Sequence, residues 1–173
     1  KTGSAGDNES GSARASGVQV TPLTVDDMEA IEKLPNIDRG YAAVLSQEQA
    51  SYGNELRRSS VLGASANYIE IDSGSKIAIG RFFSEADDKS LATVAVIGQG
   101  MKEKLFGDSD AIGKTIKLRN ERFTVIGVMA PRGAVMFMSF DDYIYVPIRT
   151  LQKKLMGTDY ISYMVHTITD VQA

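Results

Sequence analysis

The chain has 173 residues, of which 43% are hydrophobic and 24% charged, and this balance favours a folded globular protein over a disordered one. Its formal net charge of -3 provides no basic field that would attract phosphates, so we expect no nucleic acid partner. The absence of cysteine excludes disulfides, thiolate nucleophiles and thiolate metal sites.

Residues 1–17 are rich in glycine, serine and alanine and contain almost no large apolar side chain. Such a segment cannot offset the entropy of ordering its backbone, so we expect a flexible leader, either a native tether or a remnant of expression. No signal peptide is visible, and the longest apolar runs are far shorter than the roughly 20 residues that cross a bilayer. We expect the folded part to begin at residue 18.

The first helix is marked by Thr24 and, three residues later, Asp27, a spacing typical of a capping box. We expect this helix to end near Leu34, with Met28, Ile31 and Leu34 on the buried face, because Pro35 cannot continue it.

Strand patterns dominate the rest of the chain. Residues 41–45 and 60–62 fit two antiparallel strands around a turn at 52–54, with the polar stretch 47–53 interrupting the first. Downstream we expect a buried strand, a short helix that ends at Gly107, a hairpin, another strand, a last short helix and a final strand; these are placed at 92–97, 101–106, 115–128, 143–146, 149–156 and 160–168.

Two glycine motifs resemble nucleotide-binding loops without matching them. Gly98 and Gly100 follow a strand and open a helix, but Glu103 stands where a dinucleotide fingerprint needs its third glycine. Residues 107–115 end in Gly-Lys-Thr, but Asp108 stands where a phosphate-binding loop needs its first glycine, and a strand rather than a helix follows. We therefore predict no cofactor.

His166 is the only histidine, which excludes a two-histidine metal site, and we expect it to be exposed or satisfied in a terminal strand. The adjacent pairs Asp87-Asp88 and Asp141-Asp142 fit solvated turns better than metal or acid-base sites. No serine lies in a nucleophile elbow. We predict no catalytic residue, no metal site and no enzymatic activity.

A methionine and phenylalanine cluster is the one candidate binding surface that the sequence offers. Met136, Phe137, Met138 and Phe140 follow Gly133 and would form adaptable apolar surface of the kind that binds partners. The alternative is that these side chains fill the core of a small lobe, and the sequence leaves both possibilities open.

An ordered series of short segments resembles the periplasmic core domain of MacB/FtsX-like ABC transporter permeases. The segments are Gly80-Arg81-Phe82-Phe83, 94–98, Leu105-Phe106-Gly107, 111–116, 123–128 and Tyr145-Val146-Pro147, with Leu23-Thr24 and Val61-Leu62-Gly63 upstream. Each piece is short, and their order and spacing make the series specific. The resemblance covers about residues 18–150.

The resemblance implies an α+β fold in which a porter-like αβ lobe carries an inserted, smaller β-rich lobe. On this expectation residues 18–66 and 148–173 form the porter-like lobe, and residues 67–147 form the insert. The family continues for a further helix and strand after the position of residues 161–168, so we expect the porter-like lobe to be incomplete at its C-terminal end.

The resemblance also implies a non-catalytic domain on the extracytoplasmic side of the cell membrane, which couples cytoplasmic ATP hydrolysis to export of a substrate. The implied partners are an ABC ATPase subunit or domain, a second permease copy in a homodimer or heterodimer, and a periplasmic adaptor protein that docks on the 136–140 cluster. The alternatives are regulation of a cell-wall hydrolase, as in FtsX-like permeases, or release of lipoproteins.

Overall fold

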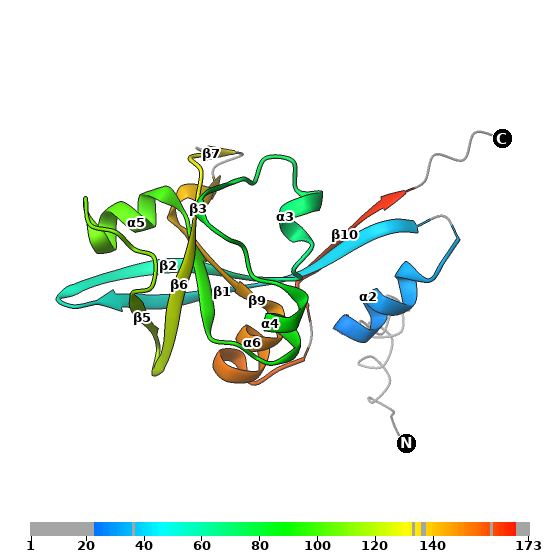
Figure 1. Cartoon of the computed structure of the whole chain (residues 1–173). Helices are drawn as coiled ribbons and strands as arrows, with labels where there is room; N and C mark the ends of the chain where they lie inside the picture. The colour runs from blue at the N-terminus through cyan, green and yellow to red at the C-terminus, as the bar shows by residue number, and fades with distance from the viewer. Residues whose placement is uncertain (1–22, 36, 133, 136–137, 160, 169–173) are drawn as a thin grey trace, which may run out of the picture.

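The computed structural model describes residues 23–35, 37–132, 134–135, 138–159 and 161–168, so the expected leader 1–17 lies outside the described part. An eight-stranded sheet organises the molecule, in the order β10-β1-β2-β9-β4-β6-β3, with β5 pairing with both β1 and β6 (Figure 1). Its strands are β1 (Ile37–Tyr52), β2 (Glu55–Ala64), β3 (Ile77–Gly80), β4 (Val94–Ile97), β5 (Thr115–Leu118), β6 (Glu121–Met129), β9 (Tyr143–Pro147) and β10 (Tyr163–Ile168).

Short helices and one small hairpin connect these strands. The helices are α2 (Val25–Glu32), α3 (Tyr68–Ile71), α4 (Glu85–Lys89), α5 (Gln99–Phe106), α6 (Ile148–Thr150), the 3-10 helix η1 (Phe140–Asp142) and the π-helix η2 (Leu151–Met156). A separate two-stranded ribbon pairs β7 (Ala134–Val135) with β8 (Met138–Ser139). The mixture of helices with parallel and antiparallel strand pairs confirms the α+β class.

Helix α2 begins where the sequence predicted. Thr24 Oγ1 accepts a hydrogen bond from the Asp27 amide at 3.2 Å, and Asp27 Oδ2 accepts one from the Thr24 amide at 2.9 Å, which completes the capping box. Met28 is buried and Ile31 is partly buried. The prediction for Leu34 was wrong: the helix ends at Glu32, so Leu34 leaves the buried face and is 54% exposed.

Strands β1 and β2 form the predicted antiparallel pair, in register from Ala43 opposite Ala64 to Tyr52 opposite Glu55. The predicted interruption at 47–53 was wrong, because β1 continues without a break to Tyr52. In this half of the strand Glu48 and Ala50 are buried, while Gln47 and Gln49 are exposed. Glu48 is neutralised by Arg119, whose Nε donates to Glu48 Oε2 at 2.9 Å, so a polar sequence still forms a half-buried strand.

The sheet separates two hydrophobic clusters. One contains side chains of α2, α5 and α6 packed on Ile97, Phe123 and Ile144. The other is aromatic and joins Tyr68 of α3 with Tyr145 of β9 and with Phe83. Because β9 pairs in parallel with β2 and antiparallel with β4, a single sheet contains strands from residues 18–66 and from residues 67–147. The boundaries of the two lobes stay a prediction.

Candidate functional site

The glycines of the Gly98-x-Gly100 motif serve close packing. The Gly98 amide donates to the Tyr143 carbonyl at 2.8 Å, and a Cβ at Gly98 would overlap the main-chain carbonyl of Asp141. A Cβ at Gly100 would lie 2.5 Å from Asp142 Oδ1. The turn η1 thus lies directly against the start of α5, where a pyrophosphate would have to lie.

The 107–115 loop uses its own backbone amides internally. The Ser109 amide donates to Phe106, the Lys114 amide to Ala111 and the Gly113 amide to Val125, at 3.0, 3.1 and 2.8 Å. Residues 115–118 form strand β5 rather than a helix. Because these three amides already donate to carbonyls of the protein, they are not available to bind a phosphate.

The acidic pairs were expected in solvated turns, and for Asp88 this was wrong. Asp88 is 3% exposed, accepts from the Arg149 amide at 2.9 Å and pairs with the Arg149 guanidinium at 2.6 Å. Asp87 completes a second capping box with Ser84, at the start of α4. Asp142 pairs with Lys104 at 3.0 Å. Among the described residues, no three histidine, aspartate or glutamate side chains gather as a metal site.

His166 lies in β10 opposite Gly40 of β1, as a terminal-strand residue. The expectation that it is exposed or satisfied was wrong, because its side chain is half-buried and its Nε2 has no hydrogen-bond partner among the described residues. A Cβ at Gly40 would overlap the imidazole, so the glycine provides the space in which the ring packs.

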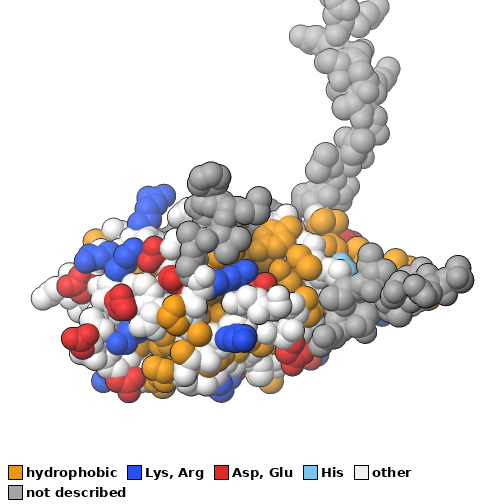
Figure 2. All heavy atoms as spheres, turned by 90° about the horizontal axis from the view of Figure 1, so that it is seen from above, with side chains coloured by type: hydrophobic (Ala, Val, Ile, Leu, Met, Phe, Trp, Pro, Cys, Tyr) orange, Lys and Arg blue, Asp and Glu red, His pale blue; other side chains and the backbone are white. Residues whose placement is uncertain are grey.

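The predicted binding cluster is only partly described. Met136 and Phe137 lie outside the described residues, and Met138 is placed by its backbone in β8. Phe140 is half-buried at the edge of the aromatic cluster, with its ring centroid 5.1 Å from that of Tyr143. Figure 2 views this side of the molecule, and hydrophobic side chains gather in its middle, beside the residues drawn in grey.

Arg132 ties the start of this loop to the aromatic cluster. Its guanidinium donates to Asp72 Oδ2 at 2.6 Å and lies 4.1 Å from the centre of the Phe140 ring. Its backbone amide donates to Asp141 Oδ1 at 2.7 Å. The same residue thus holds both sides of the segment that contains the β7–β8 hairpin.

Asp72 is the acceptor at the centre of this network, with Tyr68 and Ser75 donating to its Oδ2 at 2.8 and 2.7 Å. Burial alone would raise the pKa of Asp72, but the hydrogen bonds from Ser75, Tyr68 and Arg132 outweigh burial and hold the pKa below its ordinary value. Burial would likewise lower the pKa of Arg132, and its bond to Asp72 raises it instead. The pair is therefore ionised near neutral pH. No local pattern in the sequence indicates the Arg132–Asp72 pair, because the two residues are 60 positions apart.

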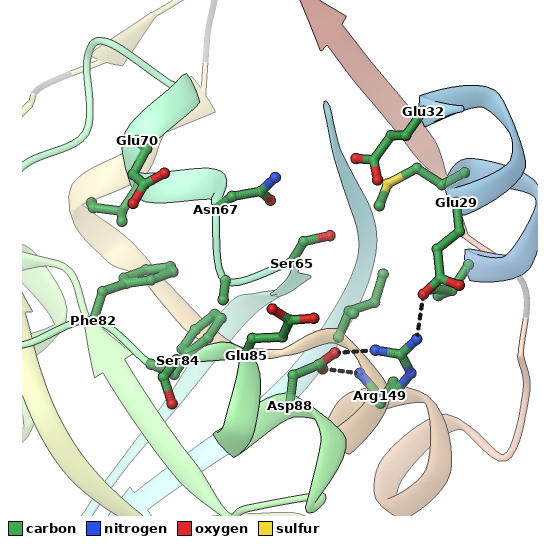
Figure 3. Close-up of a pocket in the computed structure, with 16 residues that line it drawn as sticks. Glu29, Glu32, Ser65, Asn67, Glu70, Phe82, Ser84, Glu85, Asp88 and Arg149 are labelled. Carbon is green, nitrogen blue, oxygen red and sulfur yellow. Dashed lines mark hydrogen bonds and ion pairs between the residues drawn. The ribbon is translucent and has the colours of Figure 1, made fainter. Parts of the chain in front are cut away.

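A cavity of about 560 Å³ opens between α2, α3, α4 and α6 (Figure 3). These helices lie on the side of the molecule away from the β1–β2 turn (Figure 1). Its walls come from four separate stretches of the chain, represented by Met28, Asn67, Phe82 and Arg149. Arg149 bridges Asp88 and Glu29, at 2.6 and 3.2 Å. Sequence reasoning missed this site because no local pattern brings these four stretches of the chain together.

Among the described residues, none of the helices has the length and apolar composition that a bilayer span requires. The MacB-like periplasmic core domain model matches residues 3–173. The macrolide export ATP-binding/permease protein MacB of Wolinella succinogenes is 33% identical over 153 residues, which are 88% of this chain and 24% of that protein. The pyoverdine export ATP-binding/permease protein PvdT of Pseudomonas fluorescens is 36% identical over 150 residues, which are 86% and 23% of the two chains.

Solved structures share the fold at lower identity. The periplasmic region of MacB from Actinobacillus actinomycetemcomitans superposes with a TM-score of 0.78 at 23% identity, over 96% of this chain and 73% of that one. The extracellular domain of the ABC-type transporter YknZ from Gram-positive bacteria gives a TM-score of 0.76 at 23% identity, over 87% and 75% of the two chains. The expected family is confirmed, and the chain belongs to the MacB-like periplasmic core domain family of ABC transporter permeases.

Proposed function

We propose that this chain is the non-catalytic extracytoplasmic domain of an ABC transporter permease and that it couples ATP hydrolysis on the cytoplasmic side to export of a substrate. The family match over residues 3–173 is the observation that carries the proposal. It is supported by relatives whose names describe ATP-binding/permease proteins for export, of which this chain spans about a quarter. ATP would be bound by another part of the transporter, since the 107–115 loop commits its amides to the fold.

The proposal includes docking of a periplasmic adaptor protein on the cluster Met136, Phe137, Met138 and Phe140. The contacts of Arg132 with Asp141 and with the Phe140 ring support it, because a Phe140 that is already held in place loses less entropy on binding. The parent permease would act as a homodimer or heterodimer together with an ABC ATPase subunit or domain.

Whether the domain binds an adaptor protein or a cell-wall hydrolase distinguishes a role in export from a role in hydrolase regulation. The domain is immobilised and titrated with the adaptor protein and with any cell-wall hydrolase encoded beside the permease gene. Micromolar binding of the adaptor alone is the expected result. A Phe140→Ser variant should weaken it; because the ring also contacts Tyr143 and Arg132, its melting temperature should fall as well, so binding is compared at a temperature where both proteins are folded. Binding of a hydrolase alone would replace the export proposal by the regulatory one.

A further inference from the structure

The cavity between α2, α3, α4 and α6 combines an apolar floor with acidic walls. Met28, Phe83 and Ile148, all less than 7% exposed, form the floor together with Phe82. The volume of about 560 Å³ is that of pockets which take small organic ligands. An apolar floor of this kind favours a ligand with a hydrophobic body over a bare ion.

The walls carry an excess of negative charge. Besides Glu70, which has an interaction partner of its own, four carboxylates line the cavity against one guanidinium, that of Arg149; these carboxylates are Glu29, Glu32, Glu85 and Asp88. Arg149 is itself engaged by Asp88 and Glu29, so its charge is already compensated within the wall. Lys89 pairs with Glu85 at 3.0 Å, but both side chains are largely exposed and the pair is screened by solvent. An anionic ligand would therefore be repelled and a cation attracted.

Asn67 also lines the cavity. Its Nδ2 donates to the Gly40 carbonyl, whereas its Oδ1 is shielded from solvent and has no hydrogen-bond partner among the described residues. In Figure 3 the amide points from α3 toward the side of the cavity that α2 closes. Since this oxygen is shielded from solvent, a ligand in the cavity does not reach it either, and the amide instead holds the chain before α3 against β1.

We propose that this cavity binds an organic cation that has an apolar body. The apolar floor accounts for the body and the acidic walls for the charge. A metal ion fits poorly, because the carboxylates are spread around the walls and no three of them gather in the described part of the chain. The inference is independent of adaptor docking, which involves the segment around β7 and β8.

Two dyes that share a xanthene ring system test the charge preference by fluorescence anisotropy on this chain. Rhodamine 6G is a cation, and fluorescein is an anion at neutral pH. We expect rhodamine 6G to bind at least about tenfold more tightly, a difference of about 1.4 kcal/mol. We also expect its affinity to fall as salt is raised, because charge attraction across an open cavity is screened. Equal affinity for both dyes, or no binding of rhodamine 6G, would overturn the proposal.

A charge reversal locates the site. Glu32→Lys should weaken rhodamine 6G binding by about threefold or more, with Glu32→Gln intermediate, as expected for partly exposed charge pairs. Glu55→Lys makes the same change of charge at the exposed β1–β2 turn, distant from the cavity, and should leave the affinity unchanged. Melting curves of all three variants identify any loss of folding. Equal weakening by Glu32→Lys and Glu55→Lys would show that the dye responds only to overall charge and would refute the site.

Discussion

The Cα of Gly98 lies against the main-chain carbonyl of Asp141, with no room for a side chain between them. This contact brings the 3-10 turn η1 onto the first residues of α5, and the Lys104–Asp142 ion pair at 3.0 Å closes the same junction. The Gly98-x-Gly100 motif, which resembles a cofactor loop, therefore allows α5 and η1 to pack closely against each other.

Replacing Gly98 by alanine should destabilise the domain by about 1–3 kcal/mol, because the added methyl group forces the backbone of η1 away from α5. Urea denaturation followed by circular dichroism measures the change. Ser109→Ala, in the exposed loop after α5, is the control and should have little effect. A Gly98→Ala variant as stable as the parent would contradict the packing role.

Asp72 should make the stability of the domain depend on pH. Its pKa is lower in the folded state than the ordinary 3.8, so its stabilisation is complete above that value and is lost as the pH falls through the folded pKa. Asp72→Asn should therefore cost about 1–3 kcal/mol at pH 7, and the difference from the parent should shrink below about pH 4. Thermal melts between pH 7 and pH 2.5 measure it.

Asp108→Asn serves as the control for this titration, since Asp108 lies in an exposed loop. It should leave the melting curves unchanged across the range. If Asp72→Asn destabilised the domain equally at pH 7 and pH 2.5, the contribution would come from packing rather than from the carboxylate charge.

The chain alone should not bind ATP. The amides of Ser109, Gly113 and Lys114 donate to main-chain carbonyls, and Asp108 and Asp110 would repel phosphate. Isothermal titration with Mg-ATP should give no measurable heat, and Lys114→Ala should not alter the result. A micromolar dissociation constant that Lys114→Ala abolishes would show that this loop does hold a nucleotide.

Polar substitutions separate the two interpretations of the methionine and phenylalanine cluster. If Phe137 and Met138 contact a partner, Phe137→Ser and Met138→Ser should lose adaptor binding or export while the melting temperature stays within about 2 °C of the parent. If they are core, each should cost a few kcal/mol, about the loss for truncating a buried large side chain. A large drop in stability would rule out the docking role.

Local signals in the sequence predicted local structure well. The capping box at Thr24, the helix end at Gly107 and the hairpin of β5 and β6 all form as the sequence indicated, because each depends on neighbours a few residues apart. The short helix α3 was not foreseen, and neither was the second half of β1, whose polar residues are half-buried only because Arg119 of the β5–β6 turn covers Glu48.

Long-range arrangements could not be predicted from periodicity. Strand β9 pairs with β2, where Ser60 lies opposite Tyr143, and with β4, where Val96 lies opposite Tyr145, so it joins segments that are far apart along the chain. The cavity and the Arg132–Asp72 network have the same origin, since each brings together side chains from distant segments. The family resemblance supplied the architecture that local patterns did not, and it gave no information about the acidic cavity.

The antiparallel pairing of β1 with β10 decides how the domain responds to mechanical load. Ile37 and Ile168 are paired, and the Ile161 amide donates to the Leu23 carbonyl at 2.7 Å, so the first and last described segments enter and leave at one end of the molecule (Figure 1). A force that drew the two strands apart would break their hydrogen bonds one at a time. A force that pulls both strands in the same direction does not separate them, because all of their hydrogen bonds stay in place. Such a force would move the sheet as one body.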